Sequence, residues 1–373
     1  MWRRMLGVMA LVVLMLSTAP GWASGQASAP TPTPADKPVY ADVLPGSALA
    51  FPADYGAHPD FRTEWWYVTG WLHTPDGPRG FQITFFRSRP DVEQGNPSAF
   101  SPKQILLAHV ALSDPKVGKL MQDQRIARQG FGLASAASGD TRVTLGDWQL
   151  VRGADGTYSA KADTADFSLD LKLKPSQAAL VQGDRGYSRK GPATEEASYY
   201  YSVPQLTVSG ALRQHGHTVD VSGEAWLDHE WSSNFLAARS AGWDWTGLNL
   251  DDGSALTAFQ VRDVSGKPVW AGGSFRSASG TLVVLARDDI SFATQRNWRS
   301  PRTGTSYPVV QTLTVKLPSG PRQFILTPLF DDQELDSRAT GGPVYWEGAV
   351  KTEGGKGYLE LVGYSTAVKT GGP

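Results

Sequence analysis

The stretch Ala225-Trp226-Leu227-Asp228-His229-Glu230-Trp231 places two carboxylates and an imidazole between two indoles, directly after an alternating segment from His217 to Glu224. In a β-strand, successive side chains point to opposite faces of the sheet. Alternation therefore predicts two faces, one with His229 and Trp231 and the other with Trp226, Asp228 and Glu230. A charged side chain flanked by indoles is costly to bury unless it is paired, so we expect unusual chemistry here.

Two further runs combine tryptophan with an acidic residue in strand-like surroundings. They are Arg62-Thr63-Glu64-Trp65-Trp66-Tyr67, upstream, and Gly242-Trp243-Asp244-Trp245, downstream. The three runs depart from the ordinary pattern of a β protein and mark the candidate functional region.

The composition narrows the class of protein. The chain has 373 residues and a formal net charge of −1, and it contains 40 glycines, 25 prolines, 13 tryptophans and no cysteine. The chain has no excess of basic residues, so its charge does not favour nucleic acid as a partner. The lack of cysteine excludes disulfides, thiol catalysis and zinc–thiolate sites. High glycine and proline with abundant tryptophan is typical of a turn-rich β protein with aromatic-lined interiors.

The N-terminus resembles an export signal. Arg3 and Arg4 precede an apolar core at Leu6–Leu16, and small residues follow. This pattern predicts a signal peptide over residues 1–27 and a secreted or periplasmic location, with an uncleaved signal anchor as the alternative. Residues 28–49, rich in proline, threonine, alanine and serine at their start, are predicted to be a flexible segment.

The rest of the chain predicts short strands separated by turns. Runs at Glu64–Leu72 and Gly80–Arg87 flank Asp76-Gly77, which is typical of a hairpin. Similar spacing continues to the end of the chain, and short strands at this spacing favour β-barrels or sandwiches. Two segments are compatible with a short helix. They are Gln122–Ala136, whose pattern is ambiguous, and Asn234–Ala241, a candidate linker helix.

A weak internal repeat suggests two tandem units. The skeleton Trp-x-x-Thr-Gly, Asp-Gly, Phe-Gln-Ile/Val begins at Trp66 and again at Trp243, with nearly equal spacing. Duplication of a barrel that opens with the same hairpin explains this repeat, although Thr-Gly and Asp-Gly pairs also recur by chance in hairpins.

Longer motifs resemble a known family. The pattern Phe51-Pro52-x-Asp54-x-Gly56-x-His58-Pro59-x-Phe61-Arg62-x-Glu64-Trp65-Trp66-Tyr67-x-Thr69-Gly70 is similar to that of the lipocalin-like family of bacterial carotenoid 1,2-hydratases (hydroxyneurosporene synthases). The same family includes attachment-protein (AttH)-like secreted proteins described as predicted hydrolases. The resemblance continues through Val221–Trp231 and Gly242–Trp245, and it covers essentially the whole chain after the predicted signal peptide.

The resemblance implies an all-β fold of two tandem lipocalin-like (calycin-type) β-barrels with a pocket where they meet. We place the N-terminal domain at residues 50–232 and the C-terminal domain at 233–370. The family's carotenoid hydratases are thought to use an acidic residue and a histidine, with aromatic side chains stabilising a carbocation. The residues in the matching motifs here are Asp228, His229, Trp231 and Asp244.

These residue types suit acid/base hydration of an alkene. A carboxylic acid kept neutral by apolar surroundings can protonate carbon, and a histidine can accept a proton from water. Asp228 and His229 are therefore the candidate acid/base pair, with Asp244 as support. Indole faces stabilise a cation; the candidate substrate-binding aromatics are Trp65, Tyr67, Trp231, Trp243 and Trp245.

A structural interpretation stays open beside the catalytic one. In it, Asp228 and Glu230 pair with Arg62, while His229 is hydrogen-bonded at a domain joint. Glu64 is expected to pair with an arginine. Arg62, Glu64 and Glu230 are thus candidates for supporting rather than reacting groups.

No cofactor or metal is expected. His58 lies in a predicted loop with no second histidine at a useful spacing, whereas zinc sites usually group three or four ligands. Neither a Gly-x-Ser-x-Gly nucleophile elbow nor a glycine-rich phosphate loop is found, so serine hydrolase chemistry has no motif to support it.

The sequence thus leads to two functional hypotheses. In the first, the protein is a hydratase or isomerase that acts on an apolar, isoprenoid- or lipid-like molecule. In the second, it is a non-catalytic periplasmic carrier of such a molecule, linked to an envelope transport system through a membrane permease. A purely structural envelope protein is a third possibility. The sequence does not indicate an oligomeric state.

Overall fold

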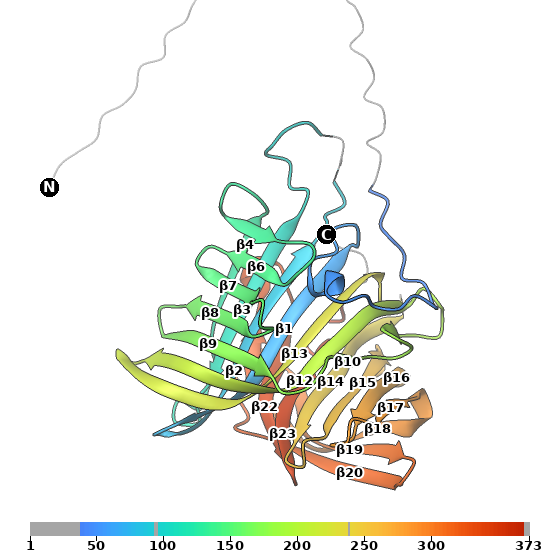
Figure 1. Cartoon of the computed structure of the whole chain (residues 1–373). Coiled ribbons are helices and arrows are strands. Elements are labelled where there is room, and N and C mark those ends of the chain that lie inside the picture. The colour runs from blue at the N-terminus through green and yellow to red at the C-terminus, as the bar shows by residue number, and fades with distance from the viewer. Residues whose placement is uncertain (1–37, 93–95, 238, 369–373) are drawn as a thin grey trace, which may run out of the picture. The chain divides into compact units, whose positions relative to one another are not determined.

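The computed structural model describes residues 38–92, 96–237 and 239–368 (Figure 1). The predicted signal peptide and the first ten residues of the predicted flexible segment lie outside this range. The described residues form one compact unit. Within the described residues the helical segments are three single 3-10 turns, and the remaining regular structure is strand.

The first sheet has 13 strands in the order β4-β3-β2-β1-β13-β12-β9-β8-β7-β6-β5, with β10 and β11 also paired to β12. Every pairing is antiparallel. The sheet curls until β3 and β4 approach β6, which nearly closes a barrel. Its strands are β1 (Thr63–Thr74), β2 (Gly77–Ser88), β3 (Ile105–Ser113), β4 (Met121–Arg128), β5 (Ala134–Ala136), β6 (Arg142–Leu145), β7 (Trp148–Arg152), β8 (Tyr158–Asp163), β9 (Phe167–Pro175), β10 (Leu180–Val181), β11 (Tyr187–Arg189), β12 (Ala197–Gln214) and β13 (His217–Asn234).

The second sheet has ten strands in the order β17-β16-β15-β14-β23-β22-β20-β19-β18, with β21 paired to β22. It also curls, so that β15 and β16 approach β18. Its strands are β14 (Ser240–Leu250), β15 (Ala255–Asp263), β16 (Pro268–Arg276), β17 (Leu282–Leu285), β18 (Ile290–Arg299), β19 (Ser306–Leu317), β20 (Gly320–Pro328), β21 (Glu334–Asp336), β22 (Val344–Thr352) and β23 (Gly355–Leu361). The 3-10 turns are η1 (Ala53–Tyr55), η2 (Arg287–Asp289) and η3 (Arg338–Thr340).

The predicted all-β fold of two tandem barrels is confirmed. The hairpin predicted around Asp76-Gly77 is β1–β2, with Thr74 paired to Gly77. The second copy of the repeat is β14–β15, the first hairpin of the second sheet. The domain boundary at 232/233 stays a prediction, because the sheets belong to one compact unit and residue 232 lies inside β13.

Both optional helices are wrong. Gln122–Ala136 contains β4 and β5, and β4 pairs with β3 along its whole length. Its side chains are mostly half-buried, so the segment shows neither a helical nor a strand period, and tertiary pairing decides its conformation. The described part of Asn234–Ala241 is the end of β13, a short connection and the start of β14.

The three largest of five apolar clusters among the described residues account for most of the core. Two of them fill the interiors of the first and second sheets. The third lies between the sheets and joins Tyr67, Trp71 and Trp226 to Trp245 and Phe259. Burial of aromatic side chains is a large stabilising contribution, so this third cluster fixes one sheet against the other beside the site described below. No helix among the described residues is long and apolar enough to cross a membrane.

Candidate active site between the two sheets

Strand β13 places its acidic residues because it lies between β1 and β12. Asp228 is opposite Tyr67 of β1 and Ser202 of β12, whereas the next residue, His229, is opposite Trp66 and Tyr201. The alternation predicted for Ala225–Trp231 is therefore present, and the two faces of the strand enter different surroundings.

Asp228 faces a pocket between the two sheets. The cavity has a volume of about 190 Å³, more than the roughly 150 Å³ that accommodates benzene in an engineered apolar cavity. Four of the predicted aromatics line it: Trp65, Tyr67, Trp243 and Trp245. Phe86, Phe235 and Phe259 complete an apolar wall that suits a flat or extended apolar ligand.

The Asp228 carboxyl is buried and accepts three hydrogen bonds. The donors are the Tyr200 hydroxyl at 2.7 Å, the Ser202 hydroxyl at 2.5 Å and the Trp226 indole at 2.7 Å. Burial raises the pKa of Asp228 from 3.8 to about 7, although these three donors favour the ionised form. Near neutral pH this carboxyl therefore exchanges readily between acid and base.

Glu230 lies beside Asp228 in the same pocket and is paired with Lys190. The ammonium is 2.9 Å from Glu230 Oε1, and it also lies over the rings of Tyr200 and Phe259. The expected pairing of these carboxylates with Arg62 is wrong, because the Arg62 guanidinium lies over the ring of Tyr40. Lys190 lies in a loop-rich segment. The sequence does not indicate that this segment packs near β13.

The second sheet supplies two more carboxyl groups, which the sequence argument missed. Glu347 of β22 and Glu360 of β23 are direct cross-strand neighbours, and both line the pocket. Burial, together with the charge of Glu360, raises the pKa of Glu347 well above its usual value. Tyr345-Trp346-Glu347 repeats the combination of aromatic and acidic residues found in the three runs, so the signal was available.

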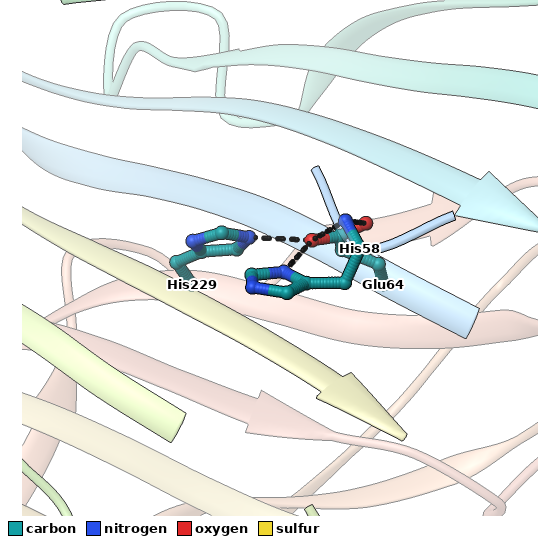
Figure 2. A group of neighbouring side chains, drawn as sticks. All are labelled: His58, Glu64 and His229. Carbon is teal, nitrogen blue, oxygen red and sulfur yellow. Dashed lines mark hydrogen bonds and ion pairs between the residues drawn. The ribbon is translucent and has the colours of Figure 1, made fainter. Parts of the chain in front are cut away.

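The opposite face of β13 carries a closed polar network (Figure 2). His229 Nε2 and His58 Nδ1 each donate to Oε1 of Glu64 at 2.8 Å. Arg87 Nε donates to Glu64 Oε2 at 2.7 Å. The Tyr201 hydroxyl lies 3.1 Å from His229 Nδ1. The arginine partner expected for Glu64 is thus Arg87.

The charges in this network balance. Burial opposes ionisation of Glu64, but the hydrogen bonds from His229 and His58 and the charge of Arg87 hold its pKa well below the usual range. Burial also opposes a charge on His58, yet hydrogen bonds to Asp54 and Glu64 raise its pKa. Burial lowers the pKa of His229, which is therefore neutral.

The same three side chains are spaced for metal binding. Ligand atoms of His58, Glu64 and His229 lie within 4.8 Å of one another. All four imidazole nitrogens already have polar partners, however, and His58 stacks on Trp231 with ring centroids 3.7 Å apart. Hydrogen bonds within the protein therefore satisfy the ligand atoms of this cluster. We assign it a structural role: it links the segment before β1 to strands β1, β2 and β13.

The remaining predicted residues do not line the pocket. His229 and Trp231 belong to the closed network on the other face of β13. Asp244 is buried on the face of β14 opposite to Trp243 and Trp245, where it accepts from Gln260, Arg262 and Tyr364 at 2.6, 3.0 and 2.9 Å. The structure thus brings Asp228 to the aromatics but separates it from His229 and Asp244.

Comparison with known proteins connects this architecture to others. Residues 42–364 match the AttH-like family. A crystal structure of a Nitrosomonas europaea protein (NE1406) that carries the AttH name is 53% identical, with a TM-score of 0.80 over 87% of this chain and 99% of that one.

Two more distant structures share the fold. Kievitone hydratase from Nectria haematococca is 16% identical, with a TM-score of 0.62 over 89% of this chain and 98% of that one. CghA, solved with Sch210972, is 12% identical, with a TM-score of 0.53 over 90% and 97% of the two chains. A comparison with curated protein sequences gave no match.

Proposed function

The chain belongs to the AttH-like family, and we propose that it binds an apolar small molecule between its two sheets and transfers a proton to it from Asp228, as a hydratase or isomerase. The observation that carries the proposal is a buried carboxyl with a pKa of about 7 that opens into an aromatic-walled pocket. An acid with a pKa near the working pH is effective in proton transfer. The fold shared with kievitone hydratase is consistent with this chemistry.

Hydration can proceed in two steps on Asp228. The neutral carboxyl gives its proton to one alkene carbon, so the π bond breaks, a C–H bond forms and a carbocation remains. Facing indoles such as Trp65 and Trp245 stabilise that cation. Water then adds to the cationic carbon and returns a proton to the Asp228 carboxylate, so the sum is alkene plus water and the acid is restored. In an isomerase, the carboxylate removes a proton from a neighbouring carbon instead.

The second candidate function is a non-catalytic carrier. It requires the same aromatic pocket but no proton transfer, and it tolerates Asp228→Asn. In this scheme the protein is exported and passes an isoprenoid or lipid to a membrane permease. What favours this candidate is the sequence pattern at residues 1–27, which predicts export.

Mass spectrometry separates the two functions. Wild-type protein, Asp228→Asn and the control Asp244→Asn are purified from the host and incubated with an organic extract of its envelope. For the enzyme, wild type and Asp244→Asn yield bound compounds that differ by one water or by double-bond position, whereas Asp228→Asn holds the unreacted compound alone. Asp244→Asn is the matched control because Asp244 is equally buried but faces away from the pocket.

The outcomes are distinct. A single unmodified apolar compound in all three proteins supports the carrier. Extracts without any apolar compound, with all three proteins folded by circular dichroism, contradict both functions and favour a structural role.

A further inference from the structure

Three polar atoms in the pocket wall lack a hydrogen-bond partner of favourable geometry, although the Tyr67 hydroxyl lies close to the Glu347 carboxyl. They are the Tyr67 hydroxyl, Gln82 Oε1 and Glu347 Oε1, and their residues are 7%, 2% and 1% exposed. A buried polar atom without a partner costs about 1–3 kcal/mol, and such atoms are rare in native structures. Three of them on residues that line one cavity indicate a site built for a polar group of a ligand.

Gln82 determines where the proton of Glu347 sits. The Gln82 amide donates to Glu347 Oε2 at 2.7 Å and to the Thr84 hydroxyl at 3.0 Å, which fixes the carboxyl group. With Oε2 already accepting a hydrogen bond, the proton of a neutral carboxyl is placed on Oε1. Glu347 Oε1 is then a donor with no acceptor in favourable geometry.

The groups around Glu347 keep it neutral. The titratable side chains that face it are Glu360 and Tyr358 of β23, Tyr345 of β22 and Tyr67 of β1. Burial and the negative charge of Glu360 raise the pKa of Glu347. Burial and the nearby carboxyl groups likewise raise the pKa of Tyr67 well above 10, so its hydroxyl keeps its proton.

We propose that the Tyr67 hydroxyl and the Glu347 carboxyl form a two-donor subsite that binds a carbonyl or phenolate oxygen of the apolar ligand. The inference rests on the proposed function, in that it assumes a small molecule in this pocket. A tyrosine hydroxyl beside a neutral carboxylic acid is the donor set of one known oxyanion hole. The ligand class is thereby narrowed to apolar molecules that carry an oxygen acceptor, and pure hydrocarbons bind less tightly.

Binding of 2-naphthol at pH 6, followed by its fluorescence, tests the subsite. Tyr67→Phe is expected to weaken binding about tenfold, the effect of one hydrogen bond in a buried site. Tyr364→Phe is the control, since its hydroxyl donates to Asp244 at 2.9 Å and does not line the pocket. That control is expected to change the affinity less than twofold.

A second variant covers the case in which Tyr67→Phe fails to fold. Glu347→Ala removes the second donor, so naphthol binding at pH 6 should weaken about tenfold. Glu347→Gln keeps an N–H donor near the same place, so its affinity at pH 6 should stay within about twofold of wild type. Equal affinity of wild type and Glu347→Ala contradicts the proposal.

Two other results overturn it. One is equal naphthol affinity of wild type and Tyr67→Phe, and the other is tighter binding of the matched cation 1-naphthylmethylammonium than of naphthol. Asp228→Asn separates the subsite from the catalytic proposal. If this variant loses no turnover but naphthol binding still depends on Tyr67, the enzyme hypothesis fails and the subsite stands.

Discussion

Asp228 and His229 are neighbours on β13, yet their side chains lie on opposite faces of the strand and in different polar environments. On one face, His229, His58 and Arg87 each hydrogen-bond to Glu64 at 2.7–2.8 Å, and together with Asp54 their charges balance. On the other face, Asp228 and the Glu347–Glu360 pair are held at raised pKa values, and several polar atoms lack partners. We call these the closed face and the open face.

The contrast assigns a role to each face. A fully paired buried network stabilises one arrangement of the strands. Removing one member leaves its partners unpaired and strongly lowers the free energy of unfolding. Unpaired and protonated acids reduce stability, and proteins keep such groups mainly at functional sites. The closed face therefore maintains the geometry of β13, and the open face is where chemistry or binding is expected.

The largest expected effect comes from breaking the closed face with Glu64→Gln. Removing the charge leaves the Arg87 guanidinium without its counter-ion and His58 with Asp54 alone, which should lower the free energy of unfolding by about 3–5 kcal/mol. Because the pKa of Glu64 is lowered in the folded protein, its contribution is present above 4.5 and is lost as pH falls toward the folded pKa. Urea unfolding at pH 7 measures the loss.

Glu224→Gln is the control for that measurement. Glu224 lies on β13 as well, but its side chain is 42% exposed and pairs with Lys356 at 3.5 Å. A surface pair contributes at most about 1 kcal/mol. If both variants lose the same small amount, the closed face does not hold β13 in place.

A smaller effect, of opposite pH sign, is expected from Asp228→Asn on the open face. The raised pKa means that the folded state binds the proton more tightly, so the contribution of Asp228 is full below 3.8 and is lost as pH rises to about 7. The unfolding free energy of the variant should fall less than that of wild type between pH 5 and 7. At about 1.4 kcal/mol per pKa unit, the difference is on the order of 2 kcal/mol.

Urea titrations at several pH values test this, with the exposed Asp220→Asn on the same strand as the control. Parallel pH profiles for wild type and Asp228→Asn would mean that Asp228 is ionised at neutral pH in the folded protein. It would then be a base or a structural acceptor rather than an acid.

The division into two faces was predictable from sequence because it depends only on strand alternation. The partner of Glu64 was also within reach: a turn that pairs Thr74 with Gly77 places Arg87 opposite Glu64 by counting back along both strands. Local pattern and turn chemistry determine both features.

The rest of the site depends on contacts between distant segments. His58 precedes His229 by 171 positions, and Glu347 follows Asp228 by 119, so no local period relates them. The prediction that Asp228 and His229 act together rests on their residue types and on the family resemblance, although strand alternation already places the two side chains on opposite faces. Nor could local composition bring Lys190 to Glu230, since a loop outside the regular strands carries it.

The smallest expected effects come from a matched pair on β12, where Tyr200 serves the open face and Tyr201 the closed face. The Tyr200 hydroxyl donates to Asp228 at 2.7 Å, and the Tyr201 hydroxyl donates to His229 at 3.1 Å. Tyr201→Phe should lower stability by about 1 kcal/mol at every pH between 5 and 8, because it removes one neutral hydrogen bond. Tyr200→Phe also leaves the Trp245 indole N–H, 3.2 Å from that hydroxyl, without its acceptor. It should therefore cost about 1 kcal/mol at pH 5, where Asp228 is neutral, and about 1 kcal/mol more at pH 8, where the carboxylate loses a donor. Urea unfolding of both variants at pH 5 and 8 measures this difference directly. If the loss of unfolding free energy has the same pH dependence in both variants, the hydrogen bonds on the two faces of β13 do not differ in their response to pH.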